Sequence, residues 1–302
     1  MKNDHCPAFS CGAVQVYLGQ QSGKFPDGNQ VLVRGGDTLV AFDTPLVARQ
    51  MQPLMQQVEL VLLSHVHEDH VVALADMPQA AVQVHHADLA AAQSWDGFKR
   101  HYGYPEPVLE QVHALIVQGF NYQPRPDATA FDDGQLWQLG GGVRVRAHHM
   151  PGHTSGHCAL VVESEGVAFI GDIDLTGFGP YYGDATSSLD QFAQSLRCVR
   201  EIDAKVWVTS HHRGVITERA EFERQLARFA AHIEQRHDKL LGYLRDGSQT
   251  LEQLVARRLL YPAGASLPFV ESAERRSISQ HLDWLQQQGR VAQAEQGVFY
   301  LV

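Results

Sequence analysis

Long apolar runs are missing from this sequence. Within its 302 residues, no stretch reaches the roughly 20 consecutive apolar residues that are needed to cross a bilayer. The first twelve residues also lack the apolar segment of a secretory signal. A hydrophobic share of 44% and a charged share of 19% are typical of a globular chain rather than a disordered one. We therefore expect a cytoplasmic protein that is not embedded in a membrane.

Cysteines are few, and none of them forms a CxxC pair. They are Cys6, Cys11, Cys158 and Cys198. A chain of this length does not need a disulfide framework. Reduced thiols are the expectation, in agreement with a cytoplasmic location.

An excess of basic residues is also missing. Lys and Arg total 24 against 34 Asp and Glu, which gives a formal net charge of −10. Residues 214–302 carry equal numbers of both signs, so the acidic excess lies entirely in residues 1–213. Nucleic-acid-binding proteins normally present a basic surface, so a nucleic-acid partner is disfavoured. Histidine, by contrast, is abundant at 17 residues, which suggests imidazoles and carboxylates gathered around cations.

Short β-rich segments alternate with helical ones over the first 213 residues. The run 58–65 is almost continuously apolar, as in a strand that is buried on both faces. Helices are predicted at 46–56 and 187–201. The other predicted strands are 14–18, 30–35, 38–43, 82–86, strands within 133–149, 159–164, 166–172 and 205–211. This order predicts an α/β fold built as a layered sandwich.

Residues 95–127 interrupt that alternation with a cluster of aromatic residues and prolines. Such a segment is consistent with a lid or a substrate-binding wall. An equally weighted interpretation is a helical hairpin that packs its aromatic side chains into the core, because long loops without secondary structure are uncommon.

The last third of the sequence is predominantly helical. An amphipathic stripe that begins at Phe222 and ends at Leu244 predicts a long helix. Helices at 251–260 and 272–288, then a hairpin turning near Gln296–Gly297, resemble a winged helix. The alternative is a small helical cap on the main domain. Because the charge of this region is balanced, we expect packing or homodimerisation rather than DNA binding. The predicted domains are 1–214, a linking helix at 215–247 and a winged-helix-like module at 248–302.

The strongest chemical signal directly follows the buried strand. It is the segment Ser64-His65-Val66-His67-Glu68-Asp69-His70. Imidazole and carboxylate suit Zn²⁺, Fe or Mn²⁺. In a loop that leaves a strand, two residues spaced two apart, such as His65 and His67, can point toward one metal position. Residues further along, such as Asp69 and His70, can point toward a second metal position. The spacing therefore favours two neighbouring metal ions over one.

Three further groups of ligand-type residues follow other predicted strands. His153 lies in the segment 150–157, Asp172 ends the hairpin 159–172, and His211 and His212 end the last strand. Strand ends are where α/β sheets build their sites, so we expect these segments to meet the first.

Together these residues resemble the metallo-β-lactamase superfamily, with its HxHxDH…H…D…H signature in order. The likeness covers about residues 12–215 and implies an αββα sandwich. By this resemblance, His65, His67 and His153 hold one metal, Asp69, His70 and His211 hold a second, and Asp172 bridges them. His212 competes with His211 for the last role, and the direction of approach from the strand favours His211.

The resemblance implies a dinuclear hydrolase, most simply with two Zn²⁺ ions, with Fe or Mn²⁺ as alternatives. A hydroxide held between the ions would attack an electrophilic carbonyl or phosphorus. Asp69 is the candidate for proton transfer. Tyr181 and Tyr182 lie in a Gly- and Pro-containing segment after Asp172, where a phenol could act as an oxyanion donor.

Function is argued from the site, because this fold supports many chemistries. A small ester-like substrate, such as a thioester or lactone, is favoured by the negative charge and the aromatic segment. A phosphodiesterase or ribonuclease is the first alternative, because some β-lactamase-like RNA endonucleases carry a small C-terminal module. A metal-containing sensor without turnover is the second.

Overall fold

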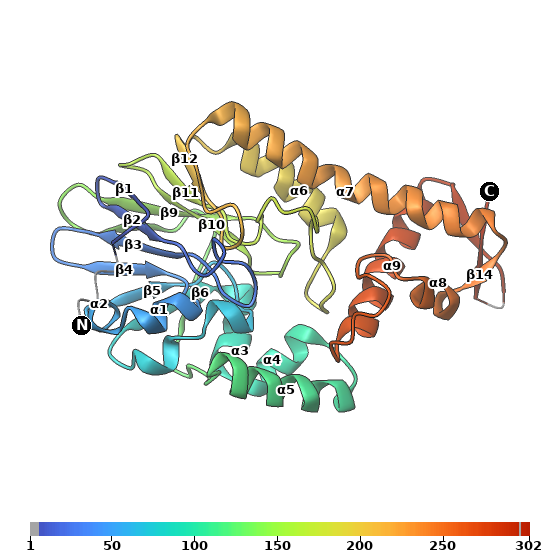
Figure 1. Ribbon diagram of the computed structural model, residues 1–302, viewed down its shortest axis with the longest axis horizontal. Coiled ribbons are helices and arrows are strands. Elements are labelled where there is room, and N and C mark those ends of the chain that lie inside the picture. The colour runs from blue at the N-terminus through green and yellow to red at the C-terminus, as the bar shows by residue number, and fades with distance from the viewer. Residues whose placement is uncertain (1–5, 296) are drawn as a thin grey trace.

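Two β-sheets pack face to face, and helices cover the outer face of each sheet (Figure 1). The computed structural model describes residues 6–295 and 297–302. This is the predicted α/β sandwich in four layers, α/β/β/α. Within the described residues, no helix is both long enough and apolar enough to cross a membrane.

The first sheet has seven strands, which lie in the order in which they occur along the chain. Its first four strands are antiparallel, and β4 to β7 run parallel to one another. The strands are β1 (Phe9–Cys11), β2 (Val14–Tyr17), β3 (Gln30–Arg34), β4 (Leu39–Phe42), β5 (Leu60–Leu62), β6 (Ala81–His85) and β7 (Thr129–Phe131). The parallel arrangement brings the carboxyl ends of β4, β5 and β6 to one edge.

The second sheet has six strands in the order β13-β12-β11-β10-β9-β8. Only β11 and β12 in this sheet pair in parallel. The strands are β8 (Leu136–Gln138), β9 (Arg144–His149), β10 (Cys158–Val162), β11 (Val167–Phe169), β12 (Val206–Val208) and β13 (Val215–Ile216). Valine-rich inner faces, including Phe42 of one sheet and Phe169 of the other, form the core between the sheets.

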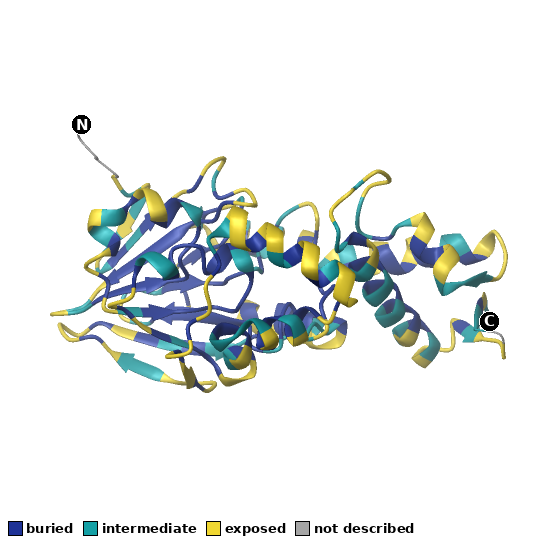
Figure 2. Cartoon of the chain, turned by 90° about the horizontal axis from the view of Figure 1, so that it is seen from below, coloured by how far each residue is buried: buried dark blue, intermediate teal, exposed yellow. Residues whose placement is uncertain are grey.

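The central strands of both sheets are buried, whereas β1, β7 and β8 at the sheet edges are partly exposed, and the helices expose their outer faces to solvent (Figure 2). β10 is buried at every residue, because one face meets the other sheet and the opposite face meets helices. This explains why the strands read as continuous apolar runs in the sequence.

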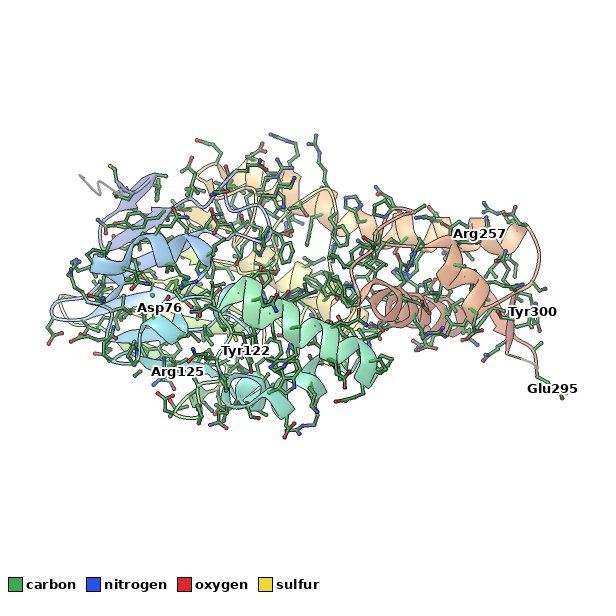
Figure 3. The ribbon with its side chains drawn as sticks, turned by 60° about the horizontal axis from the view of Figure 1, so that its bottom comes forward. Asp76, Tyr122, Arg125, Arg257, Glu295 and Tyr300 are labelled. Carbon is green, nitrogen blue, oxygen red and sulfur yellow. The ribbon has the colours of Figure 1, made fainter. Side chains whose placement is uncertain are left out.

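Five helices cover the first sheet. They are α1 (Leu46–Gln50), α2 (Gln52–Met55), α3 (Leu89–Gln93), α4 (Trp95–Tyr102) and α5 (Glu106–Phe120), with short 3-10 turns at Glu68–His70, Leu74–Asp76 and His86–Asp88. The predicted helix 46–56 is two helices, because Pro53 cannot continue the hydrogen bonding of the first. The aromatic segment 95–127 is a helical hairpin. Tyr122 and Arg125, both labelled in Figure 3, lie in the segment that follows α5. Arg125 anchors this end of the hairpin by donating to the carbonyls of Leu74, Met77 and Ala80.

Two helices and a short turn cover the second sheet. They are α6 (Leu189–Cys198), a 3-10 turn (Val199–Glu201) and α7 (Arg219–Arg245). Trp207 of β12 is 1% exposed and stacks on Phe222 of α7, with ring centroids 4.4 Å apart. The predicted linking helix begins at Arg219 rather than at residue 215. Val215 and Ile216 instead pair with β12 as an edge strand.

The C-terminal module packs around the second half of α7. It consists of β14 (Gln249–Thr250), α8 (Leu251–Arg257), α9 (Val270–Gln287), β15 (Val291–Gln293) and β16 (Val298–Leu301), with the sheet order β14-β16-β15. Leucines of α7, α8 and α9 form its own core. The predicted hairpin is present as β15 and β16, although Gln296 of its turn lies outside the described residues.

Arg236 of α7 joins this module to the sandwich. Its guanidinium is buried and donates to the carbonyls of Phe178 and Pro180 and to the hydroxyl of Tyr182. Gln280 of α9 adds a hydrogen bond to the Tyr182 carbonyl. Residues 178–182 are therefore held by hydrogen bonds from α7 and α9.

Arg236→Met should destabilise the protein by about 2 kcal/mol or more, because it leaves buried carbonyls without donors. Met preserves the helix propensity and most of the apolar stem. Arg228→Met, on the exposed face of the same helix, is the control and should change stability by less than about 0.5 kcal/mol. Urea denaturation measures both variants. Equal effects would contradict the role assigned to Arg236.

Candidate metal centre

All seven predicted ligands lie at the edge of the sandwich where strands of both sheets end. The segment 64–70 follows β5, Asp172 follows β11 and His211 follows β12, while His153 lies in the loop between β9 and β10. Six of the seven are less than 10% exposed. The sequence therefore places its donor atoms together in a buried position.

Three imidazoles form the first group. His67 Nδ1 lies 3.2 Å from His65 Nε2 and 3.0 Å from His153 Nε2. These donor atoms all lie within 4.8 Å of one another, so one cation could contact all three.

A second group of donors lies beside the first. His211 Nε2 lies 3.0 Å from Asp69 Oδ2, and His70 Nε2 lies 3.8 Å from the same oxygen. Asp172 lies between the groups, with Oδ2 3.3 Å from His153 Nε2 and Oδ1 3.1 Å from His70 Nε2. One carboxylate can therefore face both positions.

The outward ring nitrogen of each histidine has its own partner. These contacts are His65 Nδ1 to Ser64 Oγ at 3.0 Å, His67 Nε2 to Asp184 Oδ2 at 2.9 Å, His70 Nδ1 to Asp43 Oδ2 at 2.8 Å, His153 Nδ1 to the Tyr181 carbonyl at 3.0 Å and His211 Nδ1 to the Asp27 carbonyl at 2.9 Å. A carbonyl or carboxylate only accepts, and the Ser64 hydroxyl already donates to Asp43 Oδ2, so in each case the facing nitrogen donates its proton. When the ring is neutral, the opposite nitrogen then points a lone pair into the site, as metal-ligating histidines require.

The residues present fit divalent cations. His70 Nε2 and Asp172 Oδ1 are both buried and lie 3.1 Å apart, but they are not aligned for a hydrogen bond, and neither atom has another hydrogen-bond partner within the described residues. Burial would raise the pKa of Asp172, yet His70 and His211 hold that pKa well below its usual value. Burial likewise disfavours charge on His70, but Asp172, Asp69 and Asp43 outweigh it and raise the pKa of the imidazole well above its usual value. The cluster therefore attracts positive charge.

Two aspartates that sequence reasoning missed hold the ligand loops. Asp43 follows β4 and accepts from Ser64 N at 2.7 Å as well as from His70. Asp88 accepts from Val66 N, Thr154 Oγ1 and Gly156 N, and so joins the first ligand loop to that of His153. Asp43 could have been found from the sequence, because it lies at the end of a predicted strand. No neighbouring residue marks Asp88 as a residue that holds the ligand loops.

His157 positions Asp172 rather than acting as a ligand. Its Nδ1 donates to the Met150 carbonyl, and its Nε2 accepts from Asp172 N at 3.0 Å. Gly171 has φ +55, and a Cβ there would lie 2.4 Å from His157 Nε2. Glycine is required for this close approach.

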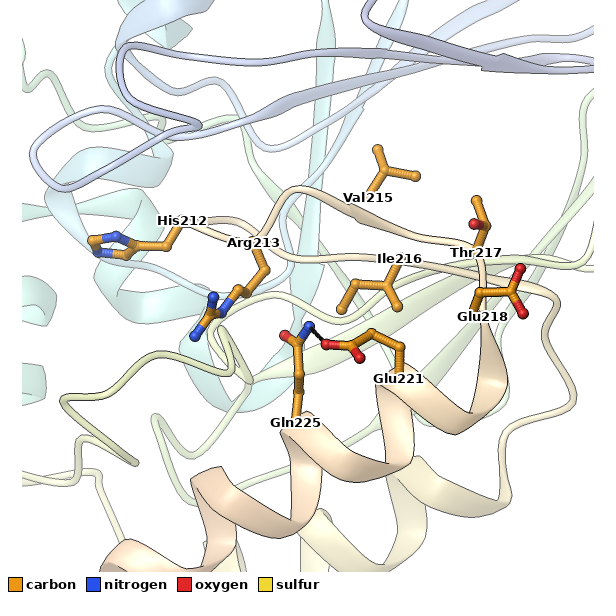
Figure 4. Close-up of a pocket in the computed structure, with 8 residues that line it drawn as sticks. All are labelled: His212, Arg213, Val215, Ile216, Thr217, Glu218, Glu221 and Gln225. Atoms are coloured by element: carbon orange, nitrogen blue, oxygen red, sulfur yellow. Dashed lines mark hydrogen bonds between the residues drawn. The ribbon is translucent and has the colours of Figure 1, made fainter.

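His211, rather than His212, belongs to the donor cluster. His212 has φ +57 and belongs to none of the donor groups formed by the described residues. It lines a shallow groove beside β13 and the start of α7, where Glu221 accepts a hydrogen bond from Gln225 (Figure 4). Its side chain also reaches the mouth of the main cavity.

A cavity of about 570 Å³ opens above the donor cluster. His67, Asp69, His153, Asp172 and His211 lie at its floor. Its walls come from the α4–α5 hairpin, the segment 174–184 and the loop 261–269 of the C-terminal module. The aromatic hairpin is therefore both helical and part of the cavity wall.

The two predicted substrate tyrosines have different positions. Tyr181 lines the cavity, but its hydroxyl donates to Asp184 Oδ1 at 3.2 Å and lies 3.1 Å from the Tyr104 hydroxyl. The prediction for Tyr182 is wrong. Its side chain is fully buried, and its hydroxyl contacts His281 and Arg236, because residues 178–182 turn it toward the C-terminal module.

The fold and the donor set define an α/β sandwich with a His/Asp cluster at one edge. A model of the Metallo-beta-lactamase superfamily matches residues 23–211. The chain belongs to this superfamily, whose members are generally hydrolases.

Similar proteins include named thioesterases. The chain is 26% identical over 204 residues to an atrochrysone carboxyl ACP thioesterase from Pseudocercospora fijiensis, covering 64% of this chain and 50% of that protein. A protein of the same description from Cryptosporiopsis is 25% identical, over 79% of this chain and 69% of its own length. A hydroxyacylglutathione hydrolase from Methylococcus capsulatus is 30% identical, over 49% of this chain and 55% of its own length. The chain thus spans about half the length of two of these relatives.

A solved structure shares almost the whole fold. A metallo-β-lactamase family protein from Thermus thermophilus matches with a TM-score of 0.70 at 23% identity, over 96% of this chain and 99% of that chain. The shared fold includes the C-terminal module, because the match extends over nearly all residues.

Asp184→Asn should weaken binding of Zn²⁺ about 10- to 100-fold, because it removes the negative charge behind His67. Competition with a chromophoric chelator measures this affinity without reference to turnover. Asp190→Asn, at an exposed carboxylate six residues further along, is the control. If both variants bind zinc as tightly as the wild type, Asp184 does not support the site.

Proposed function

We propose that this hydrolase cleaves a thioester with the help of two divalent cations, most simply Zn²⁺. His65, His67 and His153 would hold one cation, Asp69, His70 and His211 the other, and Asp172 would contact both. The observation that supports this most directly is the position of these seven side chains beneath a largely apolar cavity. The acyl group that enters the cavity belongs to a small molecule rather than to a polymer.

Two bound cations would supply an activated water of lowered pKa and polarise the attacked carbonyl. The chain itself orients the ligands through the partners of their outer ring nitrogens. Asp69 lines the cavity, and its Oδ2 lies 3.0 Å from His211 Nε2. We assign its carboxylate to take a proton from the attacking water and deliver it to the departing sulfur. A C–O bond forms, the C–S bond breaks, and a carboxylic acid and a thiol leave.

The relatives support a thioester rather than another ester. Two of them are described as ACP thioesterases, and hydroxyacylglutathione, the substrate named for a third, is itself a thioester. Because they differ in the thiol, the proposal specifies the thioester bond and not the leaving group.

A phosphodiesterase or ribonuclease is less well supported. The charged residues that line the cavity are acidic or histidine, and none of the described lining residues is Lys or Arg. A polyanionic substrate would find no basic side chain among the described lining residues to offset its charge, while Asp184 adds negative charge outside the metal positions.

Zinc-reconstituted protein should hydrolyse thioesters, lose that activity with a chelator and regain it with zinc. A lactone and bis(4-nitrophenyl) phosphate are assayed in parallel. Asp69→Asn should lower kcat by at least about 100-fold, while Asp203→Asn at an exposed site should not. Phosphodiester cleavage without thioester cleavage would favour the nuclease. Absence of any turnover in zinc-loaded protein would favour a sensor.

A further inference from the structure

Exposed apolar side chains gather around the mouth of the cavity. Phe25, Leu115, Phe178 and Leu267 are 40–47% exposed and all line it. They come from four separate segments: the loop before β3, α5, the loop after β11 and the loop between α8 and α9. Single exposed apolar residues are ordinary, but a cluster around one opening indicates a binding surface.

One face of α5 forms an apolar stripe along the cavity. Val112, Leu115, Ile116 and Gly119 all line it, and their spacing of three, four and seven residues places them on one side of the helix. A Cβ at Gly119 would meet no heavy atom within 4 Å. The cavity therefore has open space next to this glycine.

An aromatic wall extends from the donor cluster to the C-terminal module. His67 and Tyr102 have nearly parallel rings with centroids 6.0 Å apart, and Tyr102 and Tyr104 follow at 5.1 Å. Phe269, in the loop before α9, continues the series at 6.2 Å from Tyr104. The C-terminal module thus completes a wall that begins at a metal ligand.

Polar groups on this wall are already paired. The Tyr102 hydroxyl donates to Glu68, and the Tyr104 hydroxyl donates to Asp184. Beyond the donor cluster, the cavity therefore offers mainly ring and aliphatic carbon, and its charged groups are acidic. Desolvating an anionic or strongly polar group there would be costly.

We propose that the cavity is an acyl-binding site that selects thioesters with a large, uncharged, apolar acyl group, and that Leu267 and Phe269 of the C-terminal module form part of it. The volume of about 570 Å³ accommodates a chain of eight or more carbons or a fused ring system. This inference rests on the proposed thioesterase function and names its substrate class.

A series of N-acetylcysteamine thioesters tests the selectivity with zinc-loaded, full-length protein. From acetyl through octanoyl and 2-naphthoyl, kcat/KM should rise by at least about 100-fold, because each buried methylene adds to binding in the transition state. A flat or falling series would overturn the proposal.

Gly119→Leu tests where the acyl group lies. The added Cβ meets no heavy atom within 4 Å and Gly119 lines the cavity, so we expect the leucine side chain to occupy cavity space and the octanoyl-to-acetyl ratio of kcat/KM to fall by about tenfold. Gly242→Leu is the matched control, because this helical glycine of α7 is equally unobstructed and lies outside the cavity lining. If Gly119→Leu and Gly242→Leu have the same octanoyl-to-acetyl ratio of kcat/KM, the acyl group does not lie beside Gly119.

Leu267→Ser tests the contribution of the C-terminal module. It should lower the same ratio several-fold, as should Leu115→Ser on the opposite wall. Val117→Ser, equally exposed on α5 but outside the lining, should leave the ratio at the wild-type value. If only Leu115→Ser lowers the ratio, the module does not contribute.

Binding of the product acids separates this proposal from the proposed function. Calorimetry on zinc-loaded protein should show octanoate binding at least about tenfold tighter than acetate, and Gly119→Leu should remove the difference. If no thioester is turned over but this preference holds, the thioesterase function fails while the apolar site stands. Equal binding of both acids would overturn the apolar site itself.

Discussion

The carboxylates of Asp69, which is buried, and Asp172, which is 14% exposed, both lie near His211 Nε2, at 3.0 and 3.6 Å. Burying two anions this close is costly unless positive charge compensates them. In their neutral form the surrounding imidazoles present lone pairs to the same space, because the partners of their outer nitrogens fix where the remaining proton lies. Divalent cations satisfy both requirements together, and the arrangement of the loops follows from that constraint.

The rest of the sandwich serves to bring these groups to one edge. Parallel pairing of β4 with β5 and of β11 with β12 places four strand ends side by side. Asp43 then ties the end of β4 to the loop after β5, and Asp88 ties that loop to the loop between β9 and β10. The segment 178–184 adds support from outside, because its Tyr181 carbonyl and Asp184 hold two ligands while Arg236 holds the segment. These hydrogen bonds connect the C-terminal module to the candidate metal centre.

The sandwich and all seven candidate ligands could be predicted because they are local in sequence: apolar runs mark buried strands, and ligand-type residues follow those runs directly. Asp184 could not be found this way, since it contacts His67 across 117 positions of the chain. Tyr182 was misassigned because adjacent residues in an irregular segment face opposite sides, and no periodicity indicates which. The prediction of one continuous helix over residues 46–56 was wrong because of Pro53, a signal that was present in the sequence. The joint cavity of α5 and the loop 261–269 depends on how two distant elements pack, which no local pattern encodes.

The central claim is that the cluster is built for two cations on either side of Asp172. Anomalous diffraction from crystals of zinc-loaded protein tests it most directly. We expect two peaks about 3.5–4 Å apart, one contacting His65, His67 and His153 and the other contacting Asp69, His70 and His211. A single peak, or none, at saturating zinc would contradict it.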